Sequence, residues 1–325
     1  MKVLVTGATG FLGKYVVEEL VAHGYTVRAF GRNQKIGQQL QSSHVEFFQG
    51  DLTKKEDVLD ACKGVDLVVH AGALSTIWGS WEDFYRTNVV GTQLVLDACK
   101  YHNVQRLVYI SSPSIYAKAC DQLNIKESDA PKENTLNYYI KSKLMAEELI
   151  HQTPQVETVT LRPRGLFGIG DTSIFPRVLH LSQKIGIPLI RGGNQLMDMT
   201  CVENVALAVR LALESSIAGG QTYNISNGEP RTFKSMLDEV FDCLEFEKHY
   251  RHLPSGLLSC LAHSCEAFYR FFKIQKEPPL TVYTYYLLRY SQTLDISKAE
   301  TELGYHPYLS ISEGIEKYVQ NYRKH

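Results

Sequence analysis

Near its N-terminus the chain reads Met1-Lys2-Val3-Leu4-Val5-Thr6-Gly7-Ala8-Thr9-Gly10-Phe11-Leu12-Gly13. A short apolar run is followed by a glycine at every third position and then by a helical pattern. Gly7 permits a tight turn, Gly10 lets the backbone approach a phosphate because it has no Cβ, and Gly13 lets the helix pack closely on its strand. The N-terminus of that helix presents N–H groups and a positive dipole end to an anion. The stretch predicts a cradle for a dinucleotide pyrophosphate, with G-x-x-G-x-x-G spacing instead of the general G-x-G-x-x-G.

Strand and helix patterns alternate through the first half of the chain. The strand patterns are short apolar runs without alternation, as expected where both faces of a parallel sheet are buried. Strands are expected at 3–6, 26–30, 45–49, 67–70, 106–111 and 158–162, and helices at 12–23, 54–61, 87–101 and 137–151. This β-α-β rhythm predicts an α/β fold with a Rossmann-type doubly wound parallel sheet, which we assign to residues 1–163 as the NAD(P)-binding domain.

The second half is less regular and is punctuated by glycine and proline. A helix is expected at 202–214, a strand at 221–225, and mainly helix from 232 onward. We therefore expect residues 164–325 to form a smaller, mainly helical substrate-binding region that is interleaved with the last strands of the sheet.

The composition excludes several classes of protein. Of 325 residues, 44% are hydrophobic and 21% charged, with a formal net charge of −1 and no basic tract, so we expect no nucleic-acid partner. The seven cysteines form no C-x-x-C, so neither a disulfide framework nor a metal site is indicated, and a reducing cytoplasm is the expected location. The stretch 256–274 is too polar for an integral membrane segment. Core packing is favoured for its apolar residues, with an amphipathic lid or a membrane-surface face as alternatives.

The end of the second strand bears on the choice of cofactor. NAD-binding units usually place an acid there, but no Asp or Glu occurs between Glu19 and Glu46. The strand ends instead in Phe30-Gly31-Arg32-Asn33, and a guanidinium at Arg32 suits a 2′-phosphate. NADP(H) is therefore favoured, and NAD(H) stays open.

Two further strand ends are expected to contact the cofactor. Asp51, which precedes Leu52 after the third strand, can accept from the adenine amino group or cap the next helix. After the fourth strand, His70-Ala71-Gly72-Ala73 is small enough for the main chain to run beside the cofactor. We assign His70 a structural role.

A candidate reacting centre follows the fifth strand. Tyr139 and Lys143 stand at i and i+4 on one helix face. A neighbouring ammonium favours the phenolate, which predicts Tyr139 as the general acid/base, with Lys143 lowering its pKa and holding the nicotinamide ribose. Ser112 is placed to hydrogen-bond the substrate oxygen. Tyr269 and Lys273 repeat the Y-x-x-x-K pattern outside any β-α-β unit, and we regard that copy as incidental.

Taken together, the chain resembles an extended short-chain dehydrogenase/reductase of the NAD(P)-dependent epimerase/dehydratase superfamily. The resemblance is carried by the opening glycines, Gly50-Asp51-Leu52, Asn88-Val89-Val90-Gly91-Thr92, Ser112, Tyr139/Lys143, Leu161-Arg162-Pro163, Tyr223-Asn224-Ile225 and Asp295-Ile296-Ser297-Lys298-Ala299. It implies that Ser112 is catalytic in preference to Ser111 and Ser114, and that Asn88 supports the active-site helix and a proton-relay water. It also implies a homodimer formed through the helices at 88–101 and 139–151. The cofactor-binding residues that we expect are Gly7, Thr9, Gly10, Phe11, Leu12, Gly13, Arg32, Asp51, Leu52, Ala71, Gly72, Ala73, Tyr139, Lys143 and Pro163.

Finer features resemble the branch of 3β-hydroxysteroid dehydrogenases and bacterial 2-alkyl-3-oxoalkanoate reductases. These features are Trp78 to Asn88, Ser111-Ser112-Pro113-Ser114 and Glu277-Pro278-Pro279-Leu280-Thr281. Asp198-Met199-Thr200-Cys201-Val202 and Ile115-Tyr116-Ala117 depart from that branch. The resemblance implies an oxidoreductase that interconverts a ketone and a secondary alcohol on a bulky, apolar small molecule. Trp78 and Trp81 are candidate walls of the substrate pocket, with packing as the alternative reading.

Two other functions remain as alternatives. A nucleotide-sugar epimerase or dehydratase would use the same Ser/Tyr/Lys site, and Arg231 and Arg289 would then clamp a diphosphate. A nucleotide-sensing regulator on the same scaffold is disfavoured, because Ser112 and the Tyr139/Lys143 pair are all present.

Overall fold

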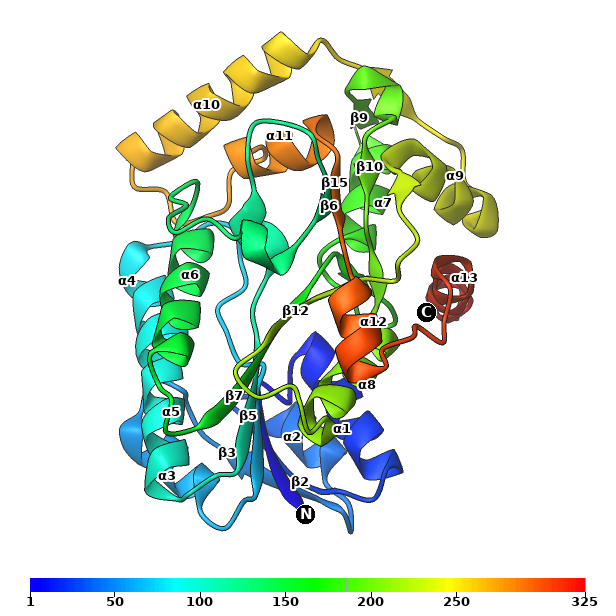
Figure 1. The fold of residues 1–325 in the computed structure, drawn as a ribbon. Helices are drawn as coiled ribbons and strands as arrows, with labels where there is room; N and C mark the ends of the chain where they lie inside the picture. The colour runs from blue at the N-terminus through cyan, green and yellow to red at the C-terminus, as the bar shows by residue number, and fades with distance from the viewer. Residues whose placement is uncertain (185, 325) are drawn as a thin grey trace.

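The centre of the computed structural model, which describes residues 1–184 and 186–324, is a seven-stranded parallel sheet (Figure 1). Its strand order is β12-β7-β5-β4-β1-β2-β3. The strands are β1 (Lys2–Thr6), β2 (Thr26–Gly31), β3 (Val45–Gln49), β4 (Leu67–His70), β5 (Arg106–Ile110), β7 (Glu157–Pro163) and β12 (Thr222–Ile225). The order reverses between β1 and β4, and open α/β sheets bind ligands at the carboxyl ends of strands beside such a reversal. The predicted Rossmann-type sheet is confirmed.

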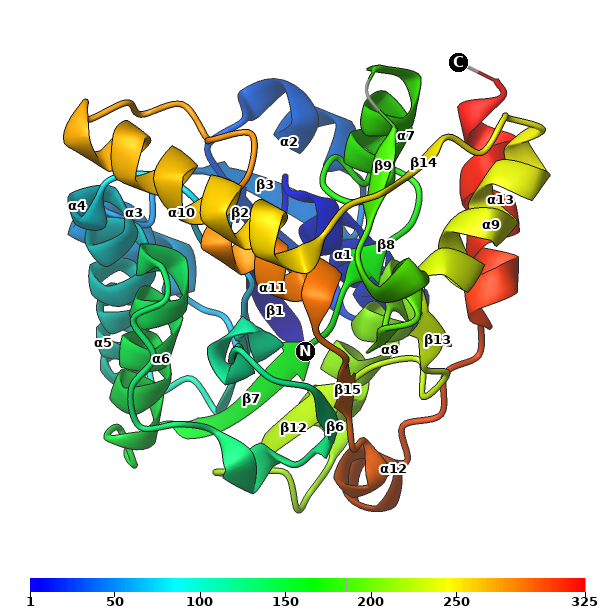
Figure 2. The ribbon, with the colours of Figure 1, turned by 90° about the horizontal axis from the view of Figure 1, so that it is seen from above.

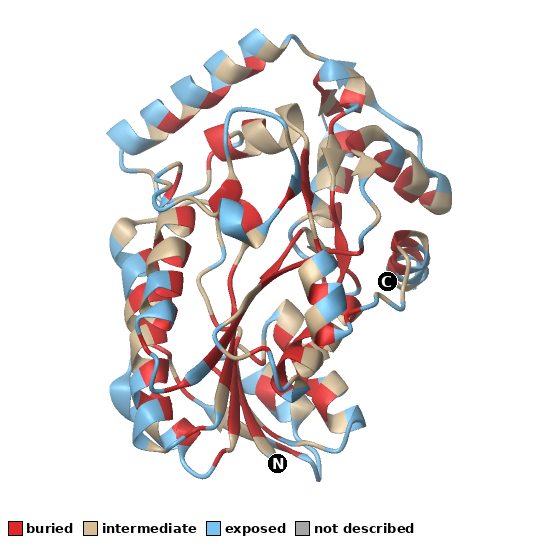
Figure 3. Cartoon of the chain, viewed as in Figure 1, coloured by how far each residue is buried: buried red, intermediate tan, exposed pale blue. Residues whose placement is uncertain are grey.

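Helices cover both faces of this sheet. They are α1 (Phe11–Ala22), α2 (Gln34–Leu40), α3 (Lys55–Cys62), α5 (Gly91–Tyr101), α6 (Tyr138–His151) and α8 (Val202–Glu214). Successive residues of β1 point to opposite faces: Val3 and Val5 join the core that contains α1 and α8, whereas Leu4 joins the core beneath α3, α5 and α6. Figure 3 shows the resulting buried centre between the layers. Because helices bury both faces of the main sheet, its strands are continuous apolar runs without alternation.

A second region stands beside the carboxyl ends of the sheet. It contains a small sheet of order β13-β10-β15-β6, made from β13 (Arg231–Thr232), β10 (Leu196–Met197), β15 (Gln292–Leu294) and β6 (Gln122–Ile125). Two strand pairs accompany it: β8 (Leu166–Phe167) with β11 (Thr200–Cys201), and β9 (Ile187–Leu189) with β14 (Tyr250–His252). The helices of the region are α7 (Phe175–Lys184), α9 (Phe233–Leu244), α10 (Ser255–Phe271), α11 (Val282–Arg289), α12 (Ser297–Leu303) and α13 (Ile311–Tyr322).

The two regions exchange strands across the expected boundary at residue 163. β12 and α8 come from the second half but complete the main sheet and its covering layer. In the opposite direction, β6 comes from the first half and pairs with β15. The second region is mainly helical, as expected, but short strands, which the sequence pattern did not indicate, also build its wall.

Short helices connect the elements around the strand ends. They are α4 (Trp81–Phe84), the π-helix η1 (Tyr85–Val90), and the 3-10 helices η2 (Pro113–Tyr116), η3 (Glu127–Asp129) and η4 (Arg191–Gly193). The helix expected at 87–101 therefore begins in a π turn. Single π turns recur at functional sites, and this one carries Asn88.

Helices α10 and α11 lie above the carboxyl ends of the main sheet (Figure 2). Leu258 and Ala262 of α10 are buried, but Leu257, Leu261 and Phe268 are 53%, 51% and 54% exposed. The core packing favoured for those three residues is therefore wrong, because the helix turns them outward. Within the described residues, no helix is both long and apolar enough to cross a membrane.

Candidate active site

A cleft of about 1060 Å³ runs along the carboxyl ends of β1 to β5 and continues to α11. One end is lined by the glycine-rich turn and the ends of β2 and β3, and the other by α7, α9 and α11. Every residue expected to bind the cofactor lines this cleft. They are Gly7, Thr9, Gly10, Phe11, Leu12, Gly13, Arg32, Asp51, Leu52, Ala71, Gly72, Ala73, Tyr139, Lys143 and Pro163.

The glycine turn has the shape that a pyrophosphate cradle requires. Gly7 has φ +70°, and a Cβ there would lie 2.7 Å from the Gly72 Cα. A Cβ on Gly13 would overlap the Gly7 carbonyl, whereas one on Gly10 would meet only that carbonyl oxygen, at 3.1 Å. Gly7 and Gly13 thus close the turn against protein atoms, and Gly10 leaves the cleft side open. The residues present therefore fit a dinucleotide.

Arg32 is the exposed basic residue at the end of β2 that lines the cleft. The neighbouring Arg28 is committed elsewhere: its guanidinium pairs with Glu46 at 3.2 Å and donates to the Ala61 and Lys63 carbonyls. Asp51 accepts from the Thr53 N–H and hydroxyl, both at 2.9 Å, and caps no helix, because α3 begins only at Lys55. Burial opposes these bonds, but together with the charge of Arg32 they lower the pKa of Asp51.

His70 occupies a buried network beneath the cofactor turn. Thr92 donates to the Asn88 carbonyl, so the His70 Nε2–H donates to Thr92 (3.0 Å), and Nδ1 accepts from the Thr6 hydroxyl (2.8 Å). Burial, followed by the charge of Lys143, lowers the pKa of His70 to about 3. The imidazole is therefore neutral and ties β1 and β4 to α5, as the structural assignment expects.

Ser112 and Tyr139 meet where the two ends of the cleft join. Ser112 follows β5, and its Oγ lies 2.9 Å from the Ser114 Oγ. Burial raises the pKa of Tyr139 to about 12, while a hydrogen bond from Ser112 opposes the rise and Tyr283 adds to it. The phenol is therefore protonated at neutral pH and is positioned with Ser112 to donate to one oxygen.

Lys143 lies one turn after Tyr139, but its ammonium points toward β5. Nζ donates to the Ile110 carbonyl at 2.8 Å and to the Tyr109 hydroxyl at 3.2 Å. Burial lowers the pKa of Lys143 to about 8, against the charge of Glu147. In this cofactor-free arrangement burial dominates the pKa of Tyr139, and the Lys143 ammonium is bound to the end of β5. That Lys143, together with the positive ring of an oxidised nicotinamide, favours the phenolate of Tyr139 stays a prediction.

Asn88 holds two parts of the site together. Its amide accepts from the Leu74 N–H at 2.7 Å and donates to the Leu74 carbonyl and to the Ser142 hydroxyl. Ser142 precedes Lys143, so Asn88 fixes the helix that carries the reacting residues. One turn beyond Lys143, a buried ion pair between Glu147 and Arg162, 2.6 Å long, locks the same helix to β7.

The far end of the cleft is mostly apolar. Its lining includes Ile174, Val178, Leu181, Ile187, Met197, Met199, Phe233, Met236, Leu287 and Leu288. Two arginines also line it: Arg177 forms a two-point ion pair with Glu277, and Arg164 follows β7 directly. The sequence patterns missed these residues, since they come from many separate segments. Only the position of Arg164 after Leu161-Arg162-Pro163 gave a local signal.

Trp78 and Trp81 lie outside the residues that line the cleft. The Trp78 indole donates to the Ile274 carbonyl at 3.0 Å and packs edge-on against Tyr269. Trp81 packs against Tyr85 and Tyr138. Both residues therefore support the segments below α10, which is the packing alternative, and their role as substrate contacts stays a prediction.

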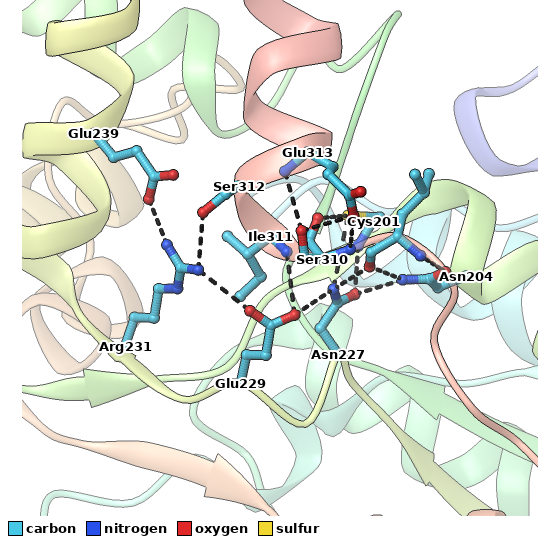
Figure 4. Close-up of polar contacts among 11 residues, drawn as sticks. Cys201, Asn204, Asn227, Glu229, Arg231, Glu239, Ser310, Ile311, Ser312 and Glu313 are labelled. Atoms are coloured by element: carbon cyan, nitrogen blue, oxygen red, sulfur yellow. Dashed lines mark hydrogen bonds and ion pairs between the residues drawn. The ribbon is translucent and has the colours of Figure 1, made fainter.

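Arg231 and Arg289 also lie away from the cleft. Arg231 pairs with Glu229 and Glu239 and donates to the Ser312 hydroxyl (Figure 4). Arg289 donates to the Ser255 hydroxyl at 2.9 Å. The same close-up shows Cys201, which belongs to the departing motif Asp198-Met199-Thr200-Cys201-Val202, donating to the Ser310 carbonyl. The diphosphate clamp considered for an epimerase is therefore not formed by these two arginines.

Comparison with known proteins agrees with this geometry. The model of the NAD dependent epimerase/dehydratase family matches residues 3–226. The chain belongs to this family. It is an NAD(P)-dependent enzyme of the extended short-chain dehydrogenase/reductase type, and oxidoreductases are among its relatives.

Three curated relatives align over nearly the whole chain. The uncharacterized protein YbjS of Escherichia coli is 37% identical, with 100% of this chain and 98% of the relative covered. A 2-alkyl-3-oxoalkanoate reductase of Shewanella oneidensis is 34% identical over 96% of this chain and 84% of its own. A decarboxylating sterol-4-alpha-carboxylate 3-dehydrogenase of the mouse is 30% identical over 99% and 91%.

The fold is shared with solved structures. UDP-glucuronic acid 4-epimerase from Bacillus cereus, solved in complex with NAD, superposes with a TM-score of 0.79, at 22% identity and 99% coverage of both chains. In the part of this chain that the structure describes, no group of three or more His, Cys, Asp or Glu side chains could hold a metal ion. The homodimer through the helices at 88–101 and 139–151 stays a prediction.

Proposed function

We propose that this protein is an NADPH-dependent reductase that converts a ketone on a bulky, apolar small molecule into a secondary alcohol. The observation that carries the proposal is the apolar far end of the cleft, which opens beside Ser112 and Tyr139. Apolar lining with a few convergent polar groups is typical of sites for apolar ligands. Relatives named as a 2-alkyl-3-oxoalkanoate reductase and a sterol 3-dehydrogenase support the same chemistry.

NADPH, when held by the glycine turn and the strand ends of the cofactor end, would supply the hydride, and this chain supplies the proton and the geometry. The ketone oxygen accepts hydrogen bonds from Ser112 and Tyr139, which polarises the C=O bond. As the carbon receives the hydride, the oxygen takes the phenolic proton of Tyr139, and the C=O bond becomes H–C–O–H. Holding the reactants together in one cleft supplies much of the rate.

The pKa of Tyr139 supports its role as a proton donor. Burial raises this pKa to about 12, so the cofactor-free enzyme carries the phenol at neutral pH. Tyr139 can therefore give its proton to the ketone oxygen as the alcohol forms.

Tyr139→Phe is the direct test. We expect NADPH oxidation with apolar ketones to fall by about 10²- to 10⁴-fold in kcat, because a positioned general acid contributes that much. Tyr138→Phe is the matched control: the neighbouring tyrosine is 40% exposed and packs on Trp81, outside the cleft lining. Normal turnover by Tyr139→Phe would contradict the mechanism.

The alternative of a nucleotide-sugar epimerase can be tested on the same preparation. Such an enzyme should be stabilised thermally by UDP-sugars, because a ligand that binds the native state raises its stability. Stabilisation by UDP-glucose together with no turnover of any ketone would replace the proposal.

A further inference from the structure

Arg164 is held rigidly at the junction of the two ends of the cleft. It directly follows β7, its N–H donates to the Ile225 carbonyl at 2.9 Å, and its carbonyl accepts from the Thr200 hydroxyl at 2.5 Å. Gly165 then turns the chain with φ +57°. These bonds to β12 and β11 fix the backbone of Arg164, and the residue lines the cleft although it is only 8% exposed.

The guanidinium of Arg164 has no carboxylate partner among the described residues. Other sheltered arginines do: Arg162 pairs with Glu147, Arg106 with Glu157, and Arg210 with Glu19. A buried charge is costly unless it is paired. The cleft is therefore the side from which a counter-ion can reach Arg164.

Asp198 is the acidic side chain whose charge acts on Arg164, but among the described residues the two form no ion pair. Its carboxylate accepts from the Leu294 N–H at 2.6 Å and is 3% exposed. Burial raises the pKa of Asp198, although Leu294 and the charge of Arg164 oppose the rise. The nearby Arg177 and Glu277 neutralise each other.

Tyr283 connects Arg164 to the reacting residues. It lies in α11 and is 9% exposed. Burial raises its pKa, while Arg164 and a hydrogen bond from Ser114 oppose the rise. Ser114 in turn lies 2.9 Å from Ser112, and both serines line the same cleft as Tyr139, Tyr283 and Arg164. Arg164 and the reacting residues therefore face one cleft.

We propose that Arg164, assisted by Tyr283, forms an anion-binding subsite that takes a carboxylate borne close to the reacting carbonyl of the substrate. The inference rests on the proposed ketone reduction and names the polar group that accompanies the apolar chain. A guanidinium binds a carboxylate through two parallel hydrogen bonds, and the Tyr283 hydroxyl adds a third donor. On the other side of Arg164 and Tyr283 lies a hollow of only about 10 Å³, which has room for a water and not for a substrate.

The test compares matched substrates on matched variants. The first pair is a 2-alkyl-3-hydroxyalkanoate and its methyl ester, followed in the oxidising direction with NADP⁺ so that no unstable 3-oxo acid is handled. We expect the wild-type enzyme to prefer the acid by about 100-fold in kcat/KM, and Arg164→Gln to abolish that preference mainly through KM while ester turnover is retained. Arg164→Lys should restore part of the preference, because it keeps the charge but not the planar fork.

Lys276→Gln serves as the control for a general loss of positive charge. Lys276 is exposed and is not among the residues that line the cleft, so the acid/ester ratio should stay within about twofold of the wild type. If the wild-type enzyme turned over the ester as well as the acid, and the reaction depended on Tyr139, the anion-binding subsite would be overturned. The proposed ketone reduction would still stand.

A binding measurement covers the case in which no ketone or alcohol is turned over. Thermal shift with a saturated 2-alkylalkanoate in the presence of NADP⁺ should stabilise the wild-type protein and not Arg164→Gln. No shift by the carboxylate overturns the subsite whatever the reaction. A shift by UDP or UDP-glucose that Arg164→Gln removes would assign the subsite to a phosphate and overturn the carboxylate.

Discussion

The two ends of the cleft are built in different ways. The cofactor end is a series of turns after β1, β2, β3 and β4, each of which lies next to its strand in the sequence. The substrate end is assembled from α7, β10, α9 and α11, which are brought together only by the folded chain. The first end depends on backbone shape at a few glycines, and the second on the volume and charge of scattered side chains. Substitutions at the two ends should therefore fail in different ways.

The largest effect is expected at the glycine turn. Gly13→Ala places a Cβ against the Gly7 carbonyl, so we expect a loss of about 1–3 kcal/mol in the free energy of unfolding and weaker binding of NADPH. Urea unfolding and a fluorescence titration would measure the two losses. Gly256→Ala is the control, because a Cβ there meets open space. If the two variants lost stability and affinity for NADPH equally, the backbone shape of the glycine turn would not determine cofactor binding.

Lys143 should reveal a cost in stability at the reacting centre. Burial lowers the pKa of Lys143 in the folded protein to about 8, whereas the unfolded chain keeps the ordinary lysine pKa of 10.5. Below pH 8 the side chain is protonated in both states, and the burial of its charge lowers the free energy of unfolding by about 3 kcal/mol. The cost is relieved as the pH rises from 8 toward 10.5. Lys143→Met should therefore raise the free energy of unfolding at pH 7 by about 1–2 kcal/mol. The gain is smaller than the full burial cost because the Ile110 carbonyl loses its donor. Activity should be lost in this variant.

The stabilising effect of that substitution should shrink between pH 8 and pH 10. Urea unfolding at three values of pH would measure it. A variant that is less stable than the wild type at pH 7 would show that the hydrogen bonds of Lys143 outweigh the cost of burying its charge.

Arg32 tests how far the cofactor end selects between nucleotides. Arg32→Ala should lower the ratio of kcat/KM for NADPH to that for NADH by about 30-fold, because a charge-assisted contact to the 2′-phosphate is lost. Lys35→Ala, an exposed lysine nearby that is not among the residues lining the cleft, should leave the ratio unchanged. An unchanged ratio in Arg32→Ala would show that Arg32 does not determine the preference for NADP(H).

The smallest effect is expected from a change of volume at the substrate end. Leu287→Ala removes part of the wall on α11 and should shift the preference toward longer alkyl chains by about tenfold in kcat/KM, with the KM for NADPH unaffected. Leu261→Ala, on the exposed side of α10, is the control. A change in the KM for NADPH would show that the substrate end also affects cofactor binding, which contradicts the proposed independence of the two ends.

The same contrast explains what could be predicted from the sequence. The parallel sheet, the glycine turn and the Tyr139/Lys143 helix were predictable because each depends on neighbouring residues. The burial of Arg164 was not, since it depends on Tyr283 and Asp198, which lie far away in the chain. Trp78 and Trp81 predicted a pocket wall, with packing as the alternative. The hydrogen bond from the Trp78 indole to the Ile274 carbonyl could not be predicted, because the two residues lie 196 positions apart in the chain. The i, i+4 spacing of Tyr139 and Lys143 also does not show that the Lys143 ammonium donates to the Ile110 carbonyl, because Ile110 lies 33 residues earlier in the chain.

The small sheet β13-β10-β15-β6 also has a consequence for how the molecule folds. Its strands come from four distant parts of the chain, and long loops must close before any of them can pair. Most strands of the main sheet, by contrast, can pair with a neighbour one helix away. During refolding we expect native-like β1 to β5 to precede the small sheet, so that a nucleotide site exists before the wall that faces the substrate.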